Sequence, residues 1–168
     1  NDAALELPAE DRGVEFGEAY EAAHTAKQAV ADLAMANQLT GPDDLRFALY
    51  KPDRADDPAD LRFKVITRGV MSLSRVMPHL DALGVTVIDE RPFHWDLRGE
   101  SVSLFDFGFL LPAGQTLADW GLPDRERFAD AFAASYQGRA HGGRLNRLVM
   151  SAGLTWVEVT WLRAIARY

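Results

Sequence analysis

The order of strand-like and helix-like segments is the feature that most limits how this chain can fold. From residue 45 the order is strand, strand, helix, strand, strand, helix. Rotating it by one strand gives the split βαβ, ferredoxin-like arrangement, whose first and last strands are antiparallel neighbours. Moving the last strand to the front lets a loop join these two strands. The expected strands are residues 45–50, 61–66, 85–93 and 102–111, and the expected helices are 72–83 and 124–136.

The strand predictions rest on alternation of apolar and polar positions. Leu45, Phe47 and Leu49 alternate with other residues, which is the period of a strand. The segment 102–111 is apolar at both parities, so we expect it to be buried on both faces. Residues 51–60 should form the loop that joins the first two strands, and 94–100 a hairpin loop with Gly99. The predicted fold class is α+β: a four-stranded antiparallel sheet of permuted strand order, with helices on one face and further helices at the C-terminus.

Capping signals fix several helix ends. Thr25 and Gln28 have the spacing of a capping box, as do Thr155 and Glu158. Gly84 is placed to end a helix in the left-handed conformation. Ser72 and Asp124 are expected to cap the helices that follow them. These signals divide the chain into a lead-in with an N-terminal helix (1–40), an α+β domain (41–138) and the start of a helical segment (139–168).

Composition and charge exclude several functional classes. The chain has no cysteine, so disulfides, thiolate catalysis and cysteine-ligated metals are excluded. Its net charge is −7, with an excess of acidic residues in the first 60 positions and of basic residues in the last 30. An acidic chain is a poor match for nucleic acid. No apolar run is long enough to span a bilayer, and no secretory signal is visible. We therefore expect a cytoplasmic protein without a nucleic-acid or membrane partner.

No pattern of residues indicates a catalytic, cofactor or metal site. The triplet 106–108 reads Asp-Phe-Gly, but the other motifs of protein kinases are missing. Glycines 138, 142 and 143 follow a helix, not a strand, and do not match a dinucleotide or phosphate loop. His94 and Asp96 share a loop, yet a metal site needs three or four converging ligands. Asp89, Glu90 and Arg91 are better explained as a surface ion pair than as paired catalytic acids. We predict no catalytic, cofactor-binding or metal-binding residue.

Two longer runs carry a resemblance to a known family. Residues 73–92 give a helix with an internal proline, followed by LGVTVIDERP, and residues 145–156 read LNRLVMSAGLTW. Val102, Asp106 and Phe107 match a strand with a hydrophobic-x-Asp-Phe pattern. These runs resemble the large, bacterial, NAD-specific glutamate dehydrogenases, over about residues 16 to 168. The resemblance implies a piece of that enzyme, comprising an ACT-like domain and the lead into its central helices.

The resemblance also implies a role. The parent enzyme would convert L-glutamate and NAD to 2-oxoglutarate and ammonia, with its catalytic domains and its NAD site outside this piece. The leading hypothesis is a non-catalytic regulatory and assembly domain, which packs on other domains of its own chain and helps to form a homo-oligomer. Its basis is the doubly apolar strand 102–111 and the apolar C-terminal helix. The alternative is an ACT module that senses an amino-acid effector, at a loop that contains Arg68, Gly69 and Ser72. Backbone donors at the start of a helix would suit a carboxylate there.

Overall fold

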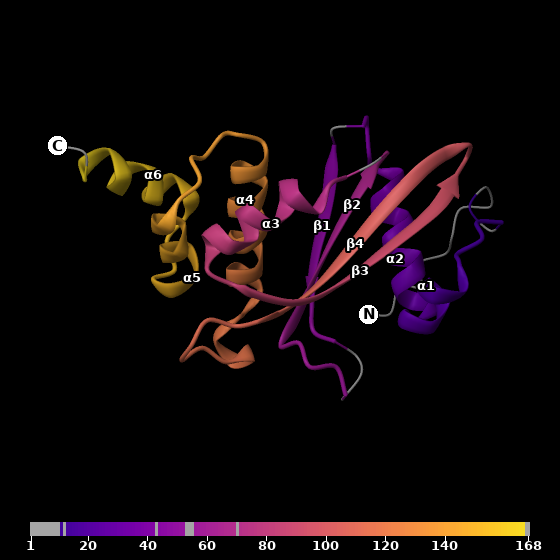
Figure 1. The fold of residues 1–168 in the computed structure, drawn as a ribbon, viewed down its shortest axis with the longest axis horizontal. Helices are drawn as coiled ribbons and strands as arrows, with labels where there is room; N and C mark the ends of the chain where they lie inside the picture. Colours follow the sequence, from indigo (N-terminus) through magenta and orange to yellow (C-terminus); the bar gives the residue numbers. More distant parts are fainter. Residues whose placement is uncertain (1–10, 12, 43, 53–55, 70, 167–168) are drawn as a thin grey trace. The chain divides into compact units, whose positions relative to one another are not determined.

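The fold is a four-stranded sheet with helices in the computed structural model, which describes residues 11, 13–42, 44–52, 56–69 and 71–166. The strand order is β1-β2-β4-β3 (Figure 1). The strands are β1 (Leu45–Tyr50), β2 (Leu61–Arg68), β3 (Thr86–Leu97) and β4 (Glu100–Leu110). The helices are α1 (Glu18–Ala23), α2 (Ala26–Asn37), α3 (Leu73–Leu83), α4 (Leu122–Tyr136), α5 (Leu148–Ser151) and α6 (Trp156–Ile165). Two 3-10 helices, η2 (Leu117–Asp119) and η3 (Arg144–Arg147), complete the described elements.

The strand order agrees with the permuted arrangement. The backbone N–H of Gly69 donates to the carbonyl of Ser101, and that of Asp60 donates to the carbonyl of Phe109. Residue numbers therefore rise along β2 as they fall along β4, so these strands are antiparallel. Because β4 lies between β2 and β3, the segment β2–α3–β3 is a split βαβ unit. The two strands that the permutation joins, β1 and β2, are neighbours, which confirms the predicted sheet.

The chain divides into two compact units, and each strand contributes residues to both. Unit 1 comprises Asn1–Ala48, Lys64–Met71 and Glu90–Asp106. Unit 2 comprises Leu49–Phe63, Ser72–Asp89 and Phe107–Tyr168.

The core of unit 1 joins α1 and α2 to the sheet. Its buried apolar side chains come from both helices and from β2, β3 and β4. The Thr25–Gln28 capping box at the start of α2 is formed, as the spacing predicted. The members of this core are Tyr20, Leu33, Ala36, Leu39, Ile66, Phe93, Trp95, Leu97, Val102 and Leu104.

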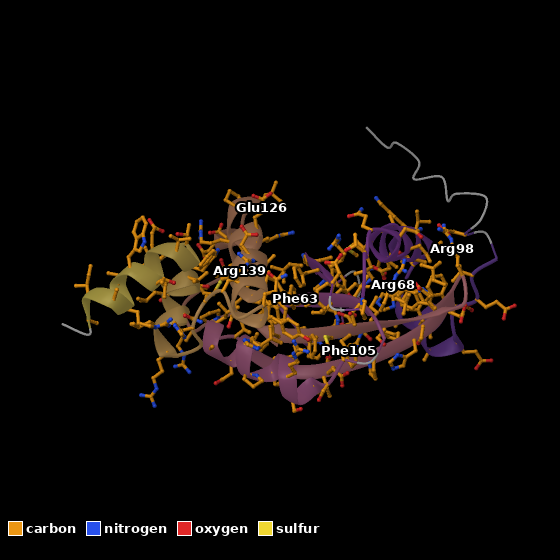
Figure 2. The ribbon with its side chains drawn as sticks, turned by 90° about the horizontal axis from the view of Figure 1, so that it is seen from above. Phe63, Arg68, Arg98, Phe105, Glu126 and Arg139 are labelled. Atoms are coloured by element: carbon orange, nitrogen blue, oxygen red, sulfur yellow. The ribbon has the colours of Figure 1, made fainter. Side chains whose placement is uncertain are left out.

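The core of unit 2 is rich in aromatic rings. Phe63 of β2, labelled in Figure 2, meets Phe128 and Phe132 of α4 edge-on, with centroid distances of 5.1 and 5.0 Å. Phe109 of β4 stacks on Phe128 at 5.6 Å, and Trp120 lies 5.9 Å from the same ring. Offset and edge-on rings add to the stabilisation from burial alone. These contacts fix α4 against the strand residues of its own unit.

β4 is buried from Val102 to Phe109, as its doubly apolar sequence predicted. Within unit 1, Val102 and Leu104 belong to the core described above. Within unit 2, Phe109 packs on Phe128. Because the apolar side chains of this strand are covered by the chain itself, β4 offers no exposed apolar surface between these positions. The part of the assembly hypothesis that used this strand as a partner surface is therefore wrong.

Two boundaries differ from the sequence predictions for local reasons. β3 continues to Leu97 through the segment expected to be a loop, because Arg98 and Gly99 alone make the turn, with φ of 56° and 80°. α4 begins at Leu122, and Asp124 lies inside its first turn, where its carboxylate accepts the N–H of Gly121 at 3.0 Å. Among the described residues, no helix combines the length and the apolarity needed to cross a membrane.

Candidate functional site

The predicted effector loop begins at the end of β2. The guanidinium of Arg68 forms an ion pair with Glu100 of β4, so that cation already has a carboxylate partner. Gly69 has a φ of +85°, a conformation that a residue with a Cβ rarely adopts. Its N–H donates to Ser101 at 3.0 Å, and its carbonyl accepts the hydroxyl of Ser103 at 2.5 Å. Both residues are thus engaged within unit 1.

Ser72 belongs to unit 2 and occupies the N-cap of α3, as predicted. Its hydroxyl makes no capping hydrogen bond, however, and lies 2.6 Å from the hydroxyl of Ser74. Val70 lies outside the described residues. Arg68 and Gly69 lie close together because they are adjacent in the chain. An effector site formed by Arg68, Gly69 and Ser72 stays a prediction.

A buried ion pair in unit 1 was missed by the sequence analysis. The Lys64 ammonium donates to Oδ2 of Asp32 at 2.7 Å, with the two side chains 3% and 2% exposed. The Tyr20 hydroxyl donates to the same oxygen at 2.6 Å. Removing a charge from water costs several kcal/mol, and close pairing with additional hydrogen bonds offsets that cost. Lys64 alternates with apolar residues of β2, a pattern typical of a strand with one solvated face, so nothing in the sequence indicated its burial.

A second buried contact in unit 1 involves the aspartate of the Asp-Phe-Gly triplet. Nε2 of His24 lies 3.3 Å from Oδ2 of Asp106, and both side chains are 1% exposed. The alignment is poor for a directed hydrogen bond, so this is a contact between two ionisable groups rather than a hydrogen bond. The His24 ring also stacks on Tyr20 with centroids 4.4 Å apart. Asp106 therefore packs in the interior, which gives the triplet a structural explanation.

Unit 2 contains a buried arginine between two carboxylates. Nη2 of Arg62 donates to Asp89 at 2.6 Å, and Nη1 donates to Asp57 at 3.2 Å. Arg62 is 1% exposed, so its guanidinium depends on these partners for the hydrogen bonds it loses to water. Asp89, which was expected to take part in a surface ion pair, also pairs with this buried arginine of β2.

Gly108 leaves room for that arginine, which gives a testable result. A Cβ at Gly108 would lie 2.8 Å from Nη1 of Arg62 and 3.0 Å from the carboxylate of Asp89. We expect Gly108→Ala to lower the free energy of unfolding by about 1–3 kcal/mol, because the crowded Arg62 guanidinium is buried and paired. Urea denaturation measures this change. The matched control is Gly142→Ala, where no atom lies within 4 Å and the change should stay within about 0.5 kcal/mol. Equal effects of the two substitutions would contradict this explanation of Gly108.

His79 makes the stability of unit 2 depend on pH. Burial lowers the pKa of His79 below its usual 6.5, and the charge of Arg75 lowers it further. The unfolded chain therefore binds more protons than the folded chain just below pH 6.5, so stability is lost as the pH falls through that range. Because Nδ1 of His79 lies 2.7 Å from the hydroxyl of Ser135, His79→Gln keeps a polar partner there. We expect this variant to flatten the fall in melting temperature below pH 6.5. An unchanged pH profile would show that other groups cause it.

These ion pairs and contacts hold the fold together. Among the described residues, no group of three or more His, Asp or Glu side chains could hold a metal ion. Gly138 and Gly143 follow α4, with φ of 73° and 144°, so they do not form the strand-to-helix loop that binds the phosphates of NAD. The strand order of the sheet and the helices that pack with it define the protein as an ACT-like α+β domain, which continues into further helices.

Comparison with known proteins places this class in a family. Sequence profiles of two glutamate dehydrogenase regions match the chain: the ACT3 domain over residues 44–120 and helical motif 3 over residues 141–168. The NAD-specific glutamate dehydrogenase of Mycobacterium tuberculosis is 35% identical over 159 residues, which are 91% of this chain and 10% of that protein. The chain belongs to the family of NAD-specific glutamate dehydrogenases.

Two further relatives agree. The NAD-specific glutamate dehydrogenase of Halomonas elongata is 32% identical over 155 residues, which are 91% of this chain and 9% of the relative. That of Pseudomonas aeruginosa is 33% identical over 142 residues, which are 83% of this chain and 9% of the relative. The chain therefore spans about a tenth of the length of the curated relatives it matches.

Proposed function

We propose that this chain is a non-catalytic regulatory and assembly domain of an NAD-dependent glutamate dehydrogenase. The longer protein would deaminate L-glutamate oxidatively to 2-oxoglutarate and ammonia, with NAD as the hydride acceptor bound by other domains. The profile matches and the names of the relatives support this assignment. The described residues contribute buried ion pairs and packed rings rather than a converging set of reactive groups. We expect the isolated chain to give no glutamate-dependent reduction of NAD.

The observation that carries the assembly role is the exposed apolar face of α6. Trp161, Leu162 and Ile165 are 63%, 40% and 70% exposed. Val159, on the other side of the helix, is 1% exposed and packs in unit 2. A helix that is apolar on both sides is stable in water only when both sides are covered, so such a face usually marks a partner surface. This helix lies in the segment that matches helical motif 3.

Polar contacts hold α6, which carries this face, in one orientation within unit 2. The guanidinium of Arg163 donates to the carbonyl of His141 at 2.8 Å and to the side-chain oxygen of Asn146 at 2.9 Å. The Thr155–Glu158 capping box, predicted from the sequence, orders the first turn of α6. These contacts hold α6 in unit 2 and leave its exposed apolar face uncovered. We propose that further helices of the same, longer chain cover it, and that the assembled chains form a homo-oligomer.

Substitution of the exposed face tests the proposal. In the full-length enzyme, we expect Trp161→Ser with Ile165→Ser to disrupt assembly and lower activity, whereas the unfolding free energy of the 168-residue chain changes by only about 0.5 kcal/mol per site. Sedimentation velocity and glutamate-dependent NAD reduction are the measurements. Leu122→Ser is the control, because Leu122 is 69% exposed but lies at the start of α4. A doubly substituted enzyme with the wild-type sedimentation and activity would rule out this surface.

A further inference from the structure

Unit 2 contains a pocket between α4 and the first turn of α6. Its volume is about 400 Å³, within the range of small-molecule sites. Its polar lining includes Glu126, Arg127 and Asp130 of α4, and its apolar lining includes Trp156 and Val157 of α6. Figure 2 labels Glu126, which projects from α4. The pocket lies outside the predicted effector loop, and of its lining residues only Thr155, which caps α6, has a role in the assignments above.

The two carboxylates of the pocket are unpaired. Glu126 and Asp130 are exposed and lie one helical turn apart on the same side of α4. Neither makes a hydrogen bond or an ion pair with another described residue. Like charges at this spacing repel each other, so a cation placed between them would be stabilised. This side of the pocket therefore suits an ammonium group.

The pocket also contains a cation, the guanidinium of Arg127. Arg127 is 22% exposed, and Nη1 donates to Asp124 at 2.8 Å, rather than to Glu126 or Asp130. Its remaining donors make no hydrogen bond among the described residues, although the pKa of Glu158, which hydrogen bonds from Thr155 lower, is lowered further by the charge of Arg127. The first N–H groups of α6, including that of Val157, lack partners within the helix. This side of the pocket suits a carboxylate.

The ring of Trp156 forms an aromatic wall of the pocket. The guanidinium of Arg139 lies 5.4 Å from the ring centroid of Trp156 and helps to fix its orientation (Figure 2 labels Arg139). The ring lines the pocket and can contact an apolar group. A simple anion would face two carboxylates for one arginine, and a simple cation would face the arginine. A ligand with both charges meets an opposite charge on each side of the pocket.

We propose that this pocket binds a small zwitterion, a free amino acid with an apolar or aromatic side chain. Its ammonium group binds to Glu126 and Asp130, its carboxylate to Arg127 and the N–H of Val157, and its side chain packs on Trp156. The ligand ties α4 to α6, and so links the end of the ACT-like domain to the helical segment. Binding of the amino acid does not depend on the assembly role. A regulatory effect of this binding rests on the proposed function.

NMR titration of the ¹⁵N-labelled 168-residue chain with each of the common L-amino acids tests this site. We expect at least one of them to shift the Trp156 indole and Val157 amide signals saturably below about 10 mM. The N-acetyl and the carboxamide derivatives of that amino acid should each bind about tenfold more weakly, because each lacks one charged group. Absence of shifts at both signals with every amino acid overturns the proposal.

Paired variants locate the binding. Glu126→Gln with Asp130→Asn should raise the dissociation constant about tenfold. The matched control, Glu21→Gln with Asp81→Asn, removes the same charge from exposed positions outside the pocket and should leave it unchanged. Ser72→Ala should also leave the dissociation constant unchanged. Loss of binding in the Ser72→Ala variant would place the ligand at the predicted effector loop and overturn the proposed pocket. Sedimentation of the α6 variants is measured separately, so a failure of binding leaves the assembly role standing.

Discussion

Replacing Lys64 by Met should lower the free energy of unfolding by about 3–5 kcal/mol, because it leaves a buried carboxylate without its cation. Lys64 donates to Asp32 at 2.7 Å, and both side chains are almost inaccessible to water. The methionine keeps most of the aliphatic volume, so the loss reports the charge rather than a cavity. Urea denaturation, followed by circular dichroism, measures it. Arg46→Met is the control, since the Arg46–Asp44 pair is 30% and 22% exposed and contributes at most about 1 kcal/mol.

A second substitution separates the ion pair from its surroundings. Lys64→Met with Asp32→Leu should recover most of the lost stability, because a packed apolar pair can replace a buried ionic one. The recovery should be incomplete by about 1–3 kcal/mol, since the Tyr20 hydroxyl loses Asp32 as its acceptor. Adding Tyr20→Phe should remove this remainder. If Lys64→Met costs no more than Arg46→Met, the pair is not a major support of unit 1.

The parts of the fold that could be predicted are those determined by residues close in sequence. The capping box of Thr25 and Gln28 joins groups three positions apart, and Gly84 ends α3 with a φ of +84°. The strand order followed from the periodicity of each segment and from the match of the element order to a permuted split βαβ arrangement. Both kinds of signal depend on the local chain, so the sheet and its helices could be predicted before the structure was known.

The buried charges could not be predicted for the opposite reason. Arg62 and Lys64 alternate with apolar residues, which is the usual pattern of a strand with one solvated face. Their partners Asp89 and Asp32 lie 27 and 32 positions away, and nothing in the local sequence connects them. Burial of a charge is decided by which elements meet, so it appears only in the folded chain. The same holds for the pocket, whose charged and aromatic groups come from α4 and α6.

The length of β3 shows how one turn can mislead a sequence prediction. His94 to Leu97 precede a glycine and were expected to be a loop. In the structure Trp95 and Leu97 are buried while His94 and Asp96 are exposed, which is strand alternation. The N–H of Gly99 donates to Asp96 at 2.7 Å, so the side chain of a strand residue stabilises a very short turn. A loop was predicted where the chain needed only two residues to reverse.

Replacing Phe128 by Ala should lower the free energy of unfolding by about 3–5 kcal/mol, the usual cost of removing a fully buried phenylalanine ring. Phe128 is 0% exposed and contacts rings from β2, β4 and the segment before α4. The control in the same helix is Leu122→Ala, at a position 69% exposed, which should cost about 0.5 kcal/mol at most. A similar cost for both substitutions would mean that the ring cluster relaxes around the cavity.

The same variant shows whether the two units unfold together. Trp95 belongs to unit 1 and Trp120 to unit 2, so ¹⁹F NMR of the fluorotryptophan-labelled chain reports each unit separately. Every strand of the sheet contributes residues to both units, and breaking a strand in one unit would leave unpaired backbone groups in the other. We therefore expect Phe128→Ala to lower the urea midpoint at Trp95 and Trp120 equally. A lower midpoint at Trp120 alone would show that unit 2 unfolds by itself, with its strand segments released from the sheet.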